Sequence, residues 1–551
     1  MVLNGSEILM EVLLEHKVDT IFGYPGGAVL NIYDALYKYK DKFTHIMPVD
    51  ECGACHAADG YARASGKTGV VIATSGPGAT NLVTPLATAY MDSVPLVAIT
   101  GNVPLGLMGK DSFQEVYIAG ITMPITKHNF IVRDIKDLAN TLRKAFIIAN
   151  SGRKGPVLVD IPKDISVAKT EYTKHFASKN SAKTPNFSEE VAQVAKLIKE
   201  SKKPLIYFGG GAKDASENLL AFMKKAQIPC VHTTMSAGTI PHNEPLNIGL
   251  VGMHGKVSSN SLMSEADLLL AIGTRFSDRV ALNPAEFAKN AKKVHIDIDI
   301  SEVGKNVSVD CSIIGDLNDI LAALCKEDCT ANSDEWLKKI QKMLQKESEP
   351  KGDENAFEPK NILEYAVKQT KENAIYATDV GQHQMWAVQF IKHAKPRSFL
   401  TSGGLGTMGF GYGAAIGAKV ACPKRPVLHI TGDGSFFMNL NEVATAVEYK
   451  LPVITIILNN KTLGMVRQWQ SAFYGKRYSS TDIDKKIDYV AVAKGFGAVG
   501  YSCKNLSEFH KAFDEALKQS VPVWIECVID KDLKVLPMIP SGGTIKDIII
   551  E

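Results

Sequence analysis

Two short polar stretches of this sequence carry the side chains best suited to bind a metal ion. Asp433 lies between two glycines directly after the apolar run 427–431, and Asn460 follows the apolar run 452–458. A carboxylate, an amide oxygen and a nearby backbone carbonyl are hard ligands that suit Mg²⁺ or Ca²⁺, and Mg²⁺ usually completes its octahedron with phosphate oxygens and water. The two stretches therefore predict a site for a metal ion and a diphosphate.

The elements around these residues explain why they would meet. Both apolar runs read as buried strands, and residues 440–449 between them have the helical spacing of apolar residues. This pattern predicts a β-α-β unit, whose parallel strands end at the same edge of a sheet. Gly-Asp-Gly alone is a common turn and Asn-Asn a common loop, so only their combination favours a site. The combination resembles the motif that binds thiamine diphosphate, and no GxxxxGK[ST] loop occurs.

Thiamine diphosphate also needs a carboxylate that faces its aminopyrimidine ring. In enzymes that use this cofactor, the glutamate comes from another domain, near the N-terminus. Glu51 meets this requirement, because it follows the apolar run 46–49 and begins a predicted helix of small residues over 52–63. A glutamate at a strand–helix junction can also serve only as a partner of the helix dipole. With the metal motif downstream, we interpret Glu51 as the activating carboxylate.

The composition is that of a globular protein. Of the 551 residues, 45% are hydrophobic and 22% are charged, and the length predicts about three domains. The formal net charge of +3 favours neither nucleic acid nor a membrane surface as a partner. No apolar run reaches the roughly 18 residues of a spanning helix. No leader pattern precedes the first helix, which Asn4 and Glu7 are placed to cap. We therefore expect a cytoplasmic protein.

The nine cysteines are scattered at irregular spacing, as expected for free thiols in a reducing compartment. Cys52 and Cys55 form one CxxC pair beside Glu51, but no second pair is present to complete a zinc site. A packing role and a redox role are both open for this pair, and we favour packing.

Two polar segments, 169–186 and 346–360, have the composition of linkers. Each of the three blocks that they separate alternates short apolar runs with helical patterns. We therefore predict an α/β protein of three doubly wound parallel sheets. The predicted domains are 1–168, 187–345 and 360–551. The apolar runs expected to form strands in the first two domains are 20–22, 70–73, 96–99, 157–161, 205–208, 268–275 and 294–299.

Over nearly its whole length the sequence resembles the catalytic subunits of the acetohydroxyacid synthases, also called acetolactate synthases, which depend on thiamine diphosphate. The resemblance rests on stretches such as FGYPGGAVLNIYDAL, AADGYARASGK, TSGPGATNLVT, AYMDSVPLVAITG, SGGLGTMGFG and GDGSFFMNLNE. The segment from Arg275 to Arg279 and the pair Gln468-Trp469 are the most discriminating. The resemblance implies an N-terminal aminopyrimidine-binding domain, a central FAD-binding-type domain and a C-terminal domain for diphosphate and Mg²⁺.

The resemblance also assigns roles to individual residues. It implies these catalytic residues: Glu51, Gly27, Gln114 and Lys163. It implies these metal ligands: Asp433, Asn460 and the carbonyl of Thr462. Thiamine diphosphate would contact Val380, Gly381, Gln382, His383, Met408, Gly432, Asp433, Gly434 and Met465. FAD would contact Arg153, Gly209, Gly210, Gly211, Thr233, Met235, Met253, His254, Arg275 and Asp316. Substrate would contact Phe113, Arg279 and Trp469.

Several of these residues also have a purely structural interpretation. Trp469 can belong to a core, Met408 can fill a gap, His383 can cap a helix and Lys163 can be a solvated charge. Spacing alone does not decide between these roles, and the resemblance favours the site.

The activity that the resemblance implies is the decarboxylation of pyruvate and the condensation of the hydroxyethyl unit with pyruvate or 2-oxobutyrate, in branched-chain amino-acid biosynthesis. It implies thiamine diphosphate, Mg²⁺ and FAD as cofactors, a homodimer or homotetramer, and a small regulatory subunit as an open possibility. One rival is a sibling thiamine enzyme: a flavin-free catabolic acetolactate synthase, a 2-oxoacid decarboxylase or a cyclic-dione hydrolase. The other is a binding protein on a decayed enzyme fold, against which the intact Glu51, Asp433 and Asn460 argue.

The sequence departs from the family pattern in three places. Asp50 and Cys52 flank Glu51 where His and Gln are usual, Ser277 stands where Asp is usual, and Tyr412-Gly413 replaces Leu-Pro. An acidic neighbour would raise the pKa of Glu51 if both carboxylates pointed into one pocket. Adjacent residues of a strand point to opposite faces, so Asp50 can point elsewhere.

Overall fold

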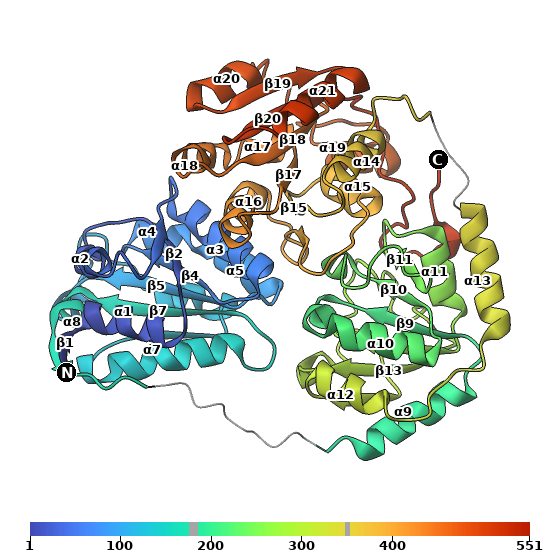
Figure 1. Cartoon of the computed structure of the whole chain (residues 1–551), viewed down its shortest axis with the longest axis horizontal. Helices are drawn as coiled ribbons and strands as arrows, with labels where there is room; N and C mark the ends of the chain where they lie inside the picture. The colour runs from blue at the N-terminus through green and yellow to red at the C-terminus, as the bar shows by residue number, and fades with distance from the viewer. Residues whose placement is uncertain (176–185, 348–352) are drawn as a thin grey trace. The chain divides into compact units, whose positions relative to one another are not determined.

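The computed structural model describes residues 1–175, 186–347 and 353–551. Within these residues the chain forms three six-stranded parallel sheets flanked by helices, together with one two-stranded antiparallel pair (Figure 1). The prediction of an α/β protein with three doubly wound sheets is thereby confirmed. Packing divides the chain into two compact units, which are Met1–Ser181 with Ala374–His383 and Leu400–Val528, and Ala182–Asn373 with Gln384–Phe399 and Ile529–Glu551. The domain boundaries 1–168, 187–345 and 360–551 stay a prediction.

The first unit contains the first sheet, whose strand order is β3-β2-β4-β5-β7-β6. Its strands are β2 (Thr20–Gly23), β3 (Thr44–Ile46), β4 (Gly69–Ala73), β5 (Leu96–Asn102), β6 (His128–Ile131) and β7 (Pro156–Pro162). Every residue of β4, β5 and β7 is buried, as expected for a parallel sheet with both faces covered. The helices are α1 (Gly5–Glu15), α2 (Leu30–Lys38), α3 (Glu51–Ser65), α4 (Pro77–Asn81), α5 (Val83–Met91), α6 (Ile118–Thr122), α7 (Ile135–Asn150) and α8 (Lys163–Val167). The predicted capping of α1 by Asn4 and Glu7 is confirmed.

The first unit also contains the third sheet except for Phe399, and the strand order is β16-β15-β17-β18-β20-β19. The strands are β15 (Ile375–Thr378), β16 (Phe399–Leu400), β17 (Val427–Gly432), β18 (Val453–Asn459), β19 (Val499–Cys503) and β20 (Val523–Val528). The predicted β-α-β unit is confirmed, because β17 and β18 pair in parallel and are joined by η6 (Leu440–Glu442) and α18 (Val443–Glu448). The strand order reverses between β15 and β17, and ligands of open α/β sheets bind at such a switch point. The helices are α14 (Pro359–Gln369), α15 (Gln382–Phe390), α16 (Phe410–Ala421), α17 (Asp433–Phe436), α19 (Gly464–Phe473), α20 (Tyr489–Phe496) and α21 (Leu506–Ala516), of which α14 and most of α15 belong to the second unit.

Helices α3 and α16 join the two sheets of this unit through small residues. A β-carbon at Gly417 would come within 1.9 Å of the Ala57 carbonyl oxygen, and one at Gly60 within 2.2 Å of the Ala414 carbonyl oxygen. Only glycine at these two positions lets the helix backbones approach so closely. The helix that begins at Glu51 is therefore packed against the first sheet and against α16, a helix of the third sheet.

The second unit contains the middle sheet, in the order β11-β10-β9-β12-β13-β14. Its strands are β9 (Pro204–Phe208), β10 (Cys230–His232), β11 (Asn247–Leu250), β12 (Leu268–Ile272), β13 (Lys292–Asp297) and β14 (Cys311–Ile314), with helices α9 (Ser188–Glu200), α10 (Ser216–Ala226), α11 (Val257–Glu265), α12 (Leu317–Leu324) and α13 (Asp334–Glu347). This order, 3-2-1-4-5-6 along the chain, is that of dinucleotide-binding sheets. The apolar run 268–275 is only partly strand, because β12 ends before Gly273, whose φ is 58°.

The prediction of a linker from residue 169 is wrong at its start. Residues 169–171 form β8 (Lys169–Glu171), which pairs antiparallel with β1 (Val2–Asn4). These polar residues form a strand because the partner supplies main-chain hydrogen bonds, and the next residue, Tyr172, packs into the core. The segments 176–185 and 348–352 of the two predicted linkers lie outside the described residues.

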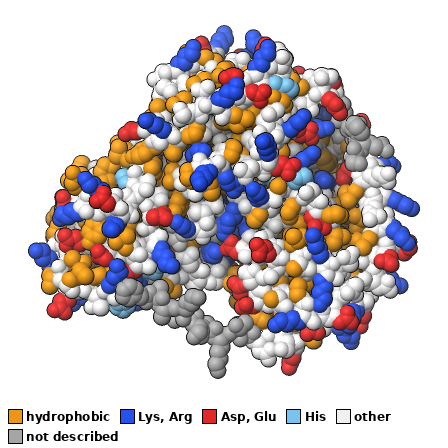
Figure 2. All heavy atoms as spheres, viewed as in Figure 1, with side chains coloured by type: hydrophobic (Ala, Val, Ile, Leu, Met, Phe, Trp, Pro, Cys, Tyr) orange, Lys and Arg blue, Asp and Glu red, His pale blue; other side chains and the backbone are white. Residues whose placement is uncertain are grey.

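Basic and acidic side chains are interspersed over the face shown in Figure 2, in agreement with the small net charge. Among the residues that the structure describes, no helix has both the length and the apolar character needed to cross a membrane. The nine cysteines are free thiols. Cys55 is buried in the core that α3 shares with its neighbours, which supports packing as its role.

Candidate functional site

The predicted metal ligands lie at the carboxyl edge of the third sheet. Asp433 begins α17 directly after β17, and Asn460 follows the neighbouring strand β18. Thr462 lies two residues further on, in a loop that is held by a bridge to Asp482 and by a 2.9 Å hydrogen bond from the Thr462 hydroxyl to the carbonyl of Thr481. The fold thus brings a carboxylate, an amide and a fixed loop backbone to one end of two adjacent strands.

Asp433 is a buried carboxyl group at the start of α17. Burial raises this pKa to about 7, and hydrogen bonding by the backbone amides of Asp433, Gly434, Asn460 and Lys461 only partly opposes the rise. A divalent cation beside this group would stabilise its ionised form. The electrostatics therefore fit a metal-binding carboxylate.

The side-chain amide of Asn460 is oriented by two glutamines. Asn460 Nδ2 donates to Gln382 Oε1 at 3.1 Å, and Gln382 Nε2 donates to Gln468 Oε1 at 3.0 Å. Asn460 Oδ1 accepts from the Thr462 amide at 3.2 Å. The Gln382 amide lies against Gly464, since a β-carbon at position 464 would come within 2.0 Å of Gln382 Oε1. The Asn460 oxygen is thus turned to the loop that carries Thr462.

The turn Val380–His383, which follows β15, lies at the switch point of the same sheet. The His383 ring packs on Gly381 and Gly432, and a β-carbon at Gly432 would come within 2.9 Å of His383 Nδ1. His383 Nε2 is buried and has no hydrogen-bond partner in the described part of the chain. Burial lowers the His383 pKa to about 4. A bound phosphate group would supply both a partner and a negative charge that favours the protonated ring, so these residues fit a diphosphate.

A buried Asp379–His429 pair lies behind this turn, and sequence reasoning missed it. Asp379 Oδ2 accepts from His429 Nε2 at 3.0 Å and from the Thr431 hydroxyl at 2.7 Å, while Oδ1 accepts from the Gly411 amide at 2.7 Å. Burial by itself would raise the Asp379 pKa, but the bond to His429 and its charge lower it to about 2. The polar residues 429 and 431 within an otherwise apolar strand were the available signal.

Glu51 lies at the carboxyl edge of the first sheet. It is the first residue of α3 and is 8% exposed. Its Oε2 accepts a 3.0 Å hydrogen bond from Asn81 Nδ2, and its Oε1 lies so close to Gly78 that a β-carbon there would be 2.9 Å away. Sequence reasoning did not single out Asn81. The short helix α4 therefore fixes the orientation of the Glu51 carboxylate.

Asp50 does not share the surroundings of Glu51. As expected, Asp50 points elsewhere, but the reason is a helix cap and not strand alternation, because β3 ends at Ile46 and Asp50 is the N-cap of α3. Its Oδ1 accepts from the Gly53 amide at 2.8 Å, as N-capping carboxylates do. The unusual acidic residue beside Glu51 thus caps the helix.

The other predicted catalytic residues follow different strands of the first sheet. Gly27 follows β2, and a β-carbon there would meet nothing within 4 Å. Gln114 follows β5 and lies against Gly76, while Phe113 beside it is 88% exposed. Lys163 is exposed at the start of α8, after β7. They share the carboxyl edge with Glu51, and their catalytic roles stay a prediction.

The chain holds Glu51 and the metal-binding residues as two half-sites. No hydrogen bond or ion pair between described residues joins Glu51 to Asp433 or Asn460. No group of three His, Cys, Asp or Glu side chains suited to a metal occurs in residues 1–175, 186–347 and 353–551. The metal site inferred above has only one carboxylate, so it would not form such a group.

Three further predicted contacts of cofactor or substrate lie in the loop before α16 and in α19. Met408 lies near Gly434, since a β-carbon at position 434 would be 4.0 Å from Met408 Cε. Met465 and Trp469 are half-buried in α19, and the rings of Trp469 and Phe473 are 5.3 Å apart. Their contacts with the cofactor and the acceptor stay a prediction.

In the second unit, the glycines predicted to contact a flavin lie at the switch point of the middle sheet. A β-carbon at Gly209 would come within 2.5 Å of the Gly273 carbonyl oxygen, and one at Gly211 within 2.9 Å of Gly273 Cα. Met235 lies against Gly210. Thr233, after β10, donates its amide to the Phe208 carbonyl. The turns after β9, β10 and β12 thus meet at one edge.

Three further residues that were predicted to contact the flavin lie in different parts of the chain. Asp316 caps α12 by accepting from the Asn318 amide at 2.8 Å, so its carboxylate already has a structural role. Arg153 belongs to the first unit, where its Nε donates to the Ser93 hydroxyl at 2.8 Å. Arg275 lies three residues after the last residue of β12, and its carbonyl accepts from Asn306 Nδ2 at 3.0 Å.

A loop pair in the second unit carries the predicted acceptor arginine. Arg279 Nη1 lies 3.9 Å from Met253 Sδ, and the Met253 amide donates to the Arg279 carbonyl at 2.9 Å. His254 beside it is buried, and burial lowers its pKa to about 4. Arg279, Met253 and His254 therefore form one cluster. The proximity of this cluster to Trp469 in the first unit stays a prediction.

Three family profiles match the chain. "Thiamine pyrophosphate enzyme, N-terminal TPP binding domain" matches residues 3–121, "central domain" matches 191–324, and "C-terminal TPP binding domain" matches 379–527. A probable acetolactate synthase large subunit of Methanocaldococcus jannaschii is 44% identical over 99% of this chain and 95% of its own length. Acetolactate synthase large subunits of Corynebacterium glutamicum and Cyanidium caldarium are 43% and 42% identical, over 99% and 98% of this chain and 90% and 95% of their own lengths.

Proposed function

The chain belongs to the thiamine pyrophosphate enzymes and, over its full length, to the acetolactate synthase large subunits, and from this premise we propose how its residues bind cofactors and substrates. The resemblance inferred from the sequence is thereby confirmed, and the activity is that of an acetolactate synthase. The observation that carries the proposal is the pair of half-sites. Asp433 and Asn460 end adjacent strands of one sheet, and the buried Glu51 lies at the carboxyl edge of another.

The third sheet would hold the diphosphate. Asp433, Asn460 and the Thr462 carbonyl would bind Mg²⁺, and the turn Val380–His383 would contact the phosphate oxygens. Support comes from the raised pKa of Asp433 and from His383 Nε2, which has no hydrogen-bond partner among the described residues. When bound, thiamine diphosphate supplies the electron sink for the decarboxylation of a 2-oxoacid.

Glu51 would exchange a proton with a ring nitrogen of the aminopyrimidine. Asn81 Nδ2 holds one carboxylate oxygen at 3.0 Å and leaves the other for the ring. The low exposure of Glu51 keeps water from competing for this proton. Glu51 is the first residue of α3, and the cap formed by Asp50 fixes that end of the helix.

The substrates would be pyruvate and a second 2-oxoacid. Arg279 would hold the acceptor carboxylate by paired hydrogen bonds. Trp469 would supply an apolar wall that favours the extra methyl group of 2-oxobutyrate, a preference of about 1–3 kcal/mol.

We extend the proposal to FAD in the second unit. The 3-2-1-4-5-6 strand order and the glycine turns that meet after β9 and β12 are the features that support it. Acetolactate formation involves no net redox change, so the flavin would be structural.

The active unit would be a homodimer or homotetramer in which Glu51 of one chain completes the metal half-site of another. The segment after β5 exposes large apolar side chains, with Phe113 88%, Tyr117 64% and Met123 63% exposed. Such a patch favours contact with a second copy. Because the relatives are named large subunits, we include a small regulatory subunit in the proposal.

The test is an assay of the purified chain with pyruvate, with and without 2-oxobutyrate, in the presence and absence of thiamine diphosphate and Mg²⁺. We expect 2-acetolactate, and 2-aceto-2-hydroxybutyrate when both acids are present, with a flavin absorption spectrum in the purified protein. Acetaldehyde as the main product would indicate a sibling decarboxylase. A colourless active protein would indicate a flavin-free synthase, and no thiamine-dependent turnover would refute the cofactor assignment.

A further inference from the structure

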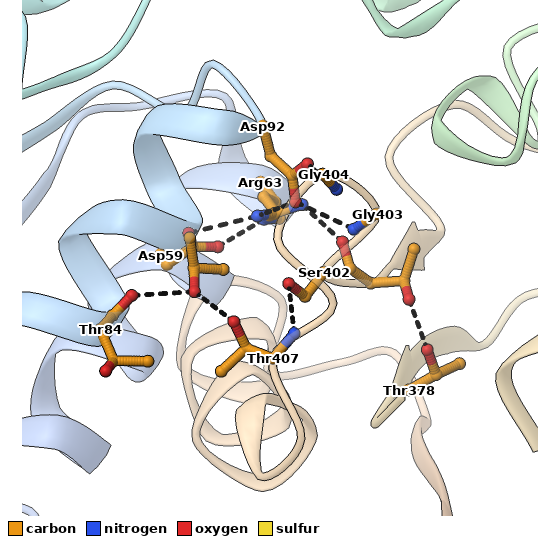
Figure 3. A network of polar contacts seen from close by, with 11 residues as sticks. Asp59, Arg63, Thr84, Asp92, Thr378, Ser402, Gly403, Gly404 and Thr407 are labelled. Carbon is orange, nitrogen blue, oxygen red and sulfur yellow. Dashed lines mark hydrogen bonds and ion pairs between the residues drawn. The ribbon is translucent and has the colours of Figure 1, made fainter. Parts of the chain in front are cut away.

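A buried arginine in the last turn of α3 connects the first sheet to a loop of the third (Figure 3). Arg63 Nε and Nη2 donate to the carboxylate of Asp59, Nη2 also donates to Asp92 Oδ2 at 2.9 Å, and Nη1 donates to the Thr401 carbonyl at 2.8 Å. The guanidinium carbon lies 5.0 Å from the centre of the Phe410 ring. Arg63 therefore uses its planar group to join two carboxylates and a backbone carbonyl.

Asp92 binds the same loop through its backbone. Its side chain is fully buried, its Oδ1 accepts from the Gly404 amide at 2.8 Å, and its Oδ2 accepts from the Gly403 amide at 3.2 Å. A β-carbon at Gly404 would come within 2.9 Å of Asp92 Oδ1, so the carboxylate lies directly on the loop. We call Arg63, Asp92 and the loop atoms that they bind the Arg63–Asp92 clasp.

The loop that the clasp holds is the one that carries Met408. Beyond the clasp, the Thr407 hydroxyl is 2.7 Å from the Thr88 hydroxyl, and the Thr407 amide donates to the Ser402 hydroxyl at 3.0 Å. On the other side of Met408, the Gly409 amide donates to the Ser435 hydroxyl at 3.1 Å. Met408 is thus fixed between one residue tied to α5 and one tied to the segment that follows Asp433.

The start of the loop is also tied to the predicted diphosphate turn. The Thr401 hydroxyl is 2.7 Å from the hydroxyl of Thr378, the last residue of β15, and Val380–His383 follows that strand. One network therefore reaches from α3, whose first residue is Glu51, to the loop of Met408 and the end of β15. None of these polar groups belongs to the metal or substrate residues described above.

We propose that Arg63 and Asp92 are positioning residues for thiamine diphosphate, and that they act by holding the loop of Met408 in the geometry that the bound cofactor needs. This inference rests on the proposed contact between Met408 and the cofactor. An ion pair that only stabilised the fold would not need two backbone amides and a carbonyl of this particular loop as its partners.

The test compares Arg63→Lys and Asp92→Asn with the wild-type protein, assayed with its cofactors and pyruvate. Lysine keeps the charge but cannot reproduce the planar fork of arginine. We expect the KM for thiamine diphosphate to rise about tenfold, while kcat at saturating cofactor changes by less than about threefold, because a displaced loop weakens a contact made to the bound cofactor. The near-ultraviolet circular dichroism of bound thiamine diphosphate should change in parallel.

Arg143→Lys is the matched control. Arg143 also forms a two-pronged ion pair within the first sheet domain, with Glu15 at 2.7 and 2.8 Å, but it contacts none of the loop residues 401–409. We expect it to lower the melting temperature by a similar amount and to leave the KM for thiamine diphosphate unchanged. If Arg63→Lys and Asp92→Asn behave like Arg143→Lys, the proposal is overturned.

Two further variants keep the test decisive. Thr88→Val removes only the hydroxyl that Thr407 contacts, so it serves if the clasp variants fail to fold, and an unchanged KM would then count against the proposal.

Met408→Ala combined with Arg63→Lys should raise the KM by less than the product of the single effects, because both act on one loop. If the two single effects on KM simply multiply in the double variant, Arg63 does not act through the loop of Met408. The proposed function is tested separately by the wild-type protein, because it would fail if that protein had no thiamine-dependent turnover.

Discussion

The carboxylate of Glu442 lies directly on Gly53, in the first turn of the helix that Glu51 begins, and a β-carbon at position 53 would come within 1.9 Å of Glu442 Oε1. The same carboxylate accepts from the amides of Val49 and Asp50 at 3.3 and 3.4 Å. Glu442 follows the turn that contains Asp433 by one short segment. Glu442, in the connection between β17 and β18, thus holds the backbone that leads into Glu51.

Glu442 should make stability depend on pH in the neutral range. Burial raises its pKa from 4.5 to about 7, so the folded chain keeps a proton that the unfolded chain loses above pH 4.5. The stabilisation is complete below pH 4.5 and is lost as the pH rises through 7. We expect this group to lower the free energy of unfolding by about 1 kcal/mol between pH 6 and pH 8, and Glu442→Gln to lack this term, in urea titrations with cofactors present.

Glu15→Gln is the control for this pH dependence. The Glu15 pKa is lowered to about 2 by the bonds to Arg143 and Tyr172, which outweigh the opposing effect of burial. Its stabilisation is present above pH 4.5 and is lost only as the pH falls through 2, so its removal should not change the slope between pH 6 and pH 8. If the free energy of unfolding changed with pH in the same way in wild type and Glu442→Gln, Glu442 would not be protonated in the folded chain.

Glu51→Gln should remove most turnover and leave the fold and the binding of Mg²⁺ with thiamine diphosphate intact. The glutamine side chain cannot take up and return the proton of the aminopyrimidine, but it can still accept from Asn81. Steady-state assays and calorimetric cofactor titrations measure the two effects. Asp50→Asn is the matched control, because it keeps the N-cap and should keep nearly normal activity. Near-normal turnover of Glu51→Gln would remove Glu51 from the catalytic role.

Metal binding should weaken in acid. Since the Asp433 pKa is about 7 without a metal ion, its carboxyl group is protonated at lower pH and binding then releases a proton. We expect the affinity for Mg²⁺ with thiamine diphosphate to fall about tenfold for each pH unit below 7. Isothermal titration at several pH values measures this, and Asp433→Asn should abolish the dependence together with most of the binding. A pH-independent affinity in wild type would contradict Asp433 as a ligand.

Trp469→Ala should lower the preference for 2-oxobutyrate over pyruvate as acceptor about tenfold, because one methyl group against an apolar wall is worth about 1–3 kcal/mol. Acetolactate formation should largely persist. The ratio of the two products in a competition assay measures the change. Trp469→Phe is the graded control, since it keeps an aromatic wall and should give an intermediate ratio. An unchanged ratio in Trp469→Ala would show that Trp469 only packs against Phe473.

Two inactive variants should restore activity when mixed. In a dimer that combines Glu51→Gln and Asp433→Ala chains, one site would receive both intact halves, because each proposed site takes Glu51 from one chain and Asp433 from the other. Activity after subunit exchange, measured against either variant alone, tests the shared site. A mixture of Glu51→Gln with Glu51→Gln is the control and should stay inactive. The shared site would be rejected if activity did not recover after demonstrated subunit exchange, or if a proven monomer were fully active.

Local patterns were enough to predict a large part of the fold and the outline of the site. Apolar runs followed by polar turn residues predicted β17 and β18, and helical spacing predicted the connection between them. The start of α3 at Glu51 and the cap of α1 by Asn4 were also correct. These features depend on residues close together in the chain, whose periodicity and capping chemistry are readable without knowing the fold. The strand at Lys169–Glu171 was missed because its partner is at the other end of the domain.

The sequence by itself determined which residue types could do the chemistry, namely a carboxylate and an amide after two apolar runs and one glutamate at a helix start. Only the tertiary structure decided which groups hold them in place. Asn81 on Glu51, His429 on Asp379, Glu442 on Gly53 and Asp92 on Gly404 each join segments that lie far apart in the chain. Such contacts form when sheets and helices pack and bury polar groups that must then find partners, and no local pattern specifies which partner that will be.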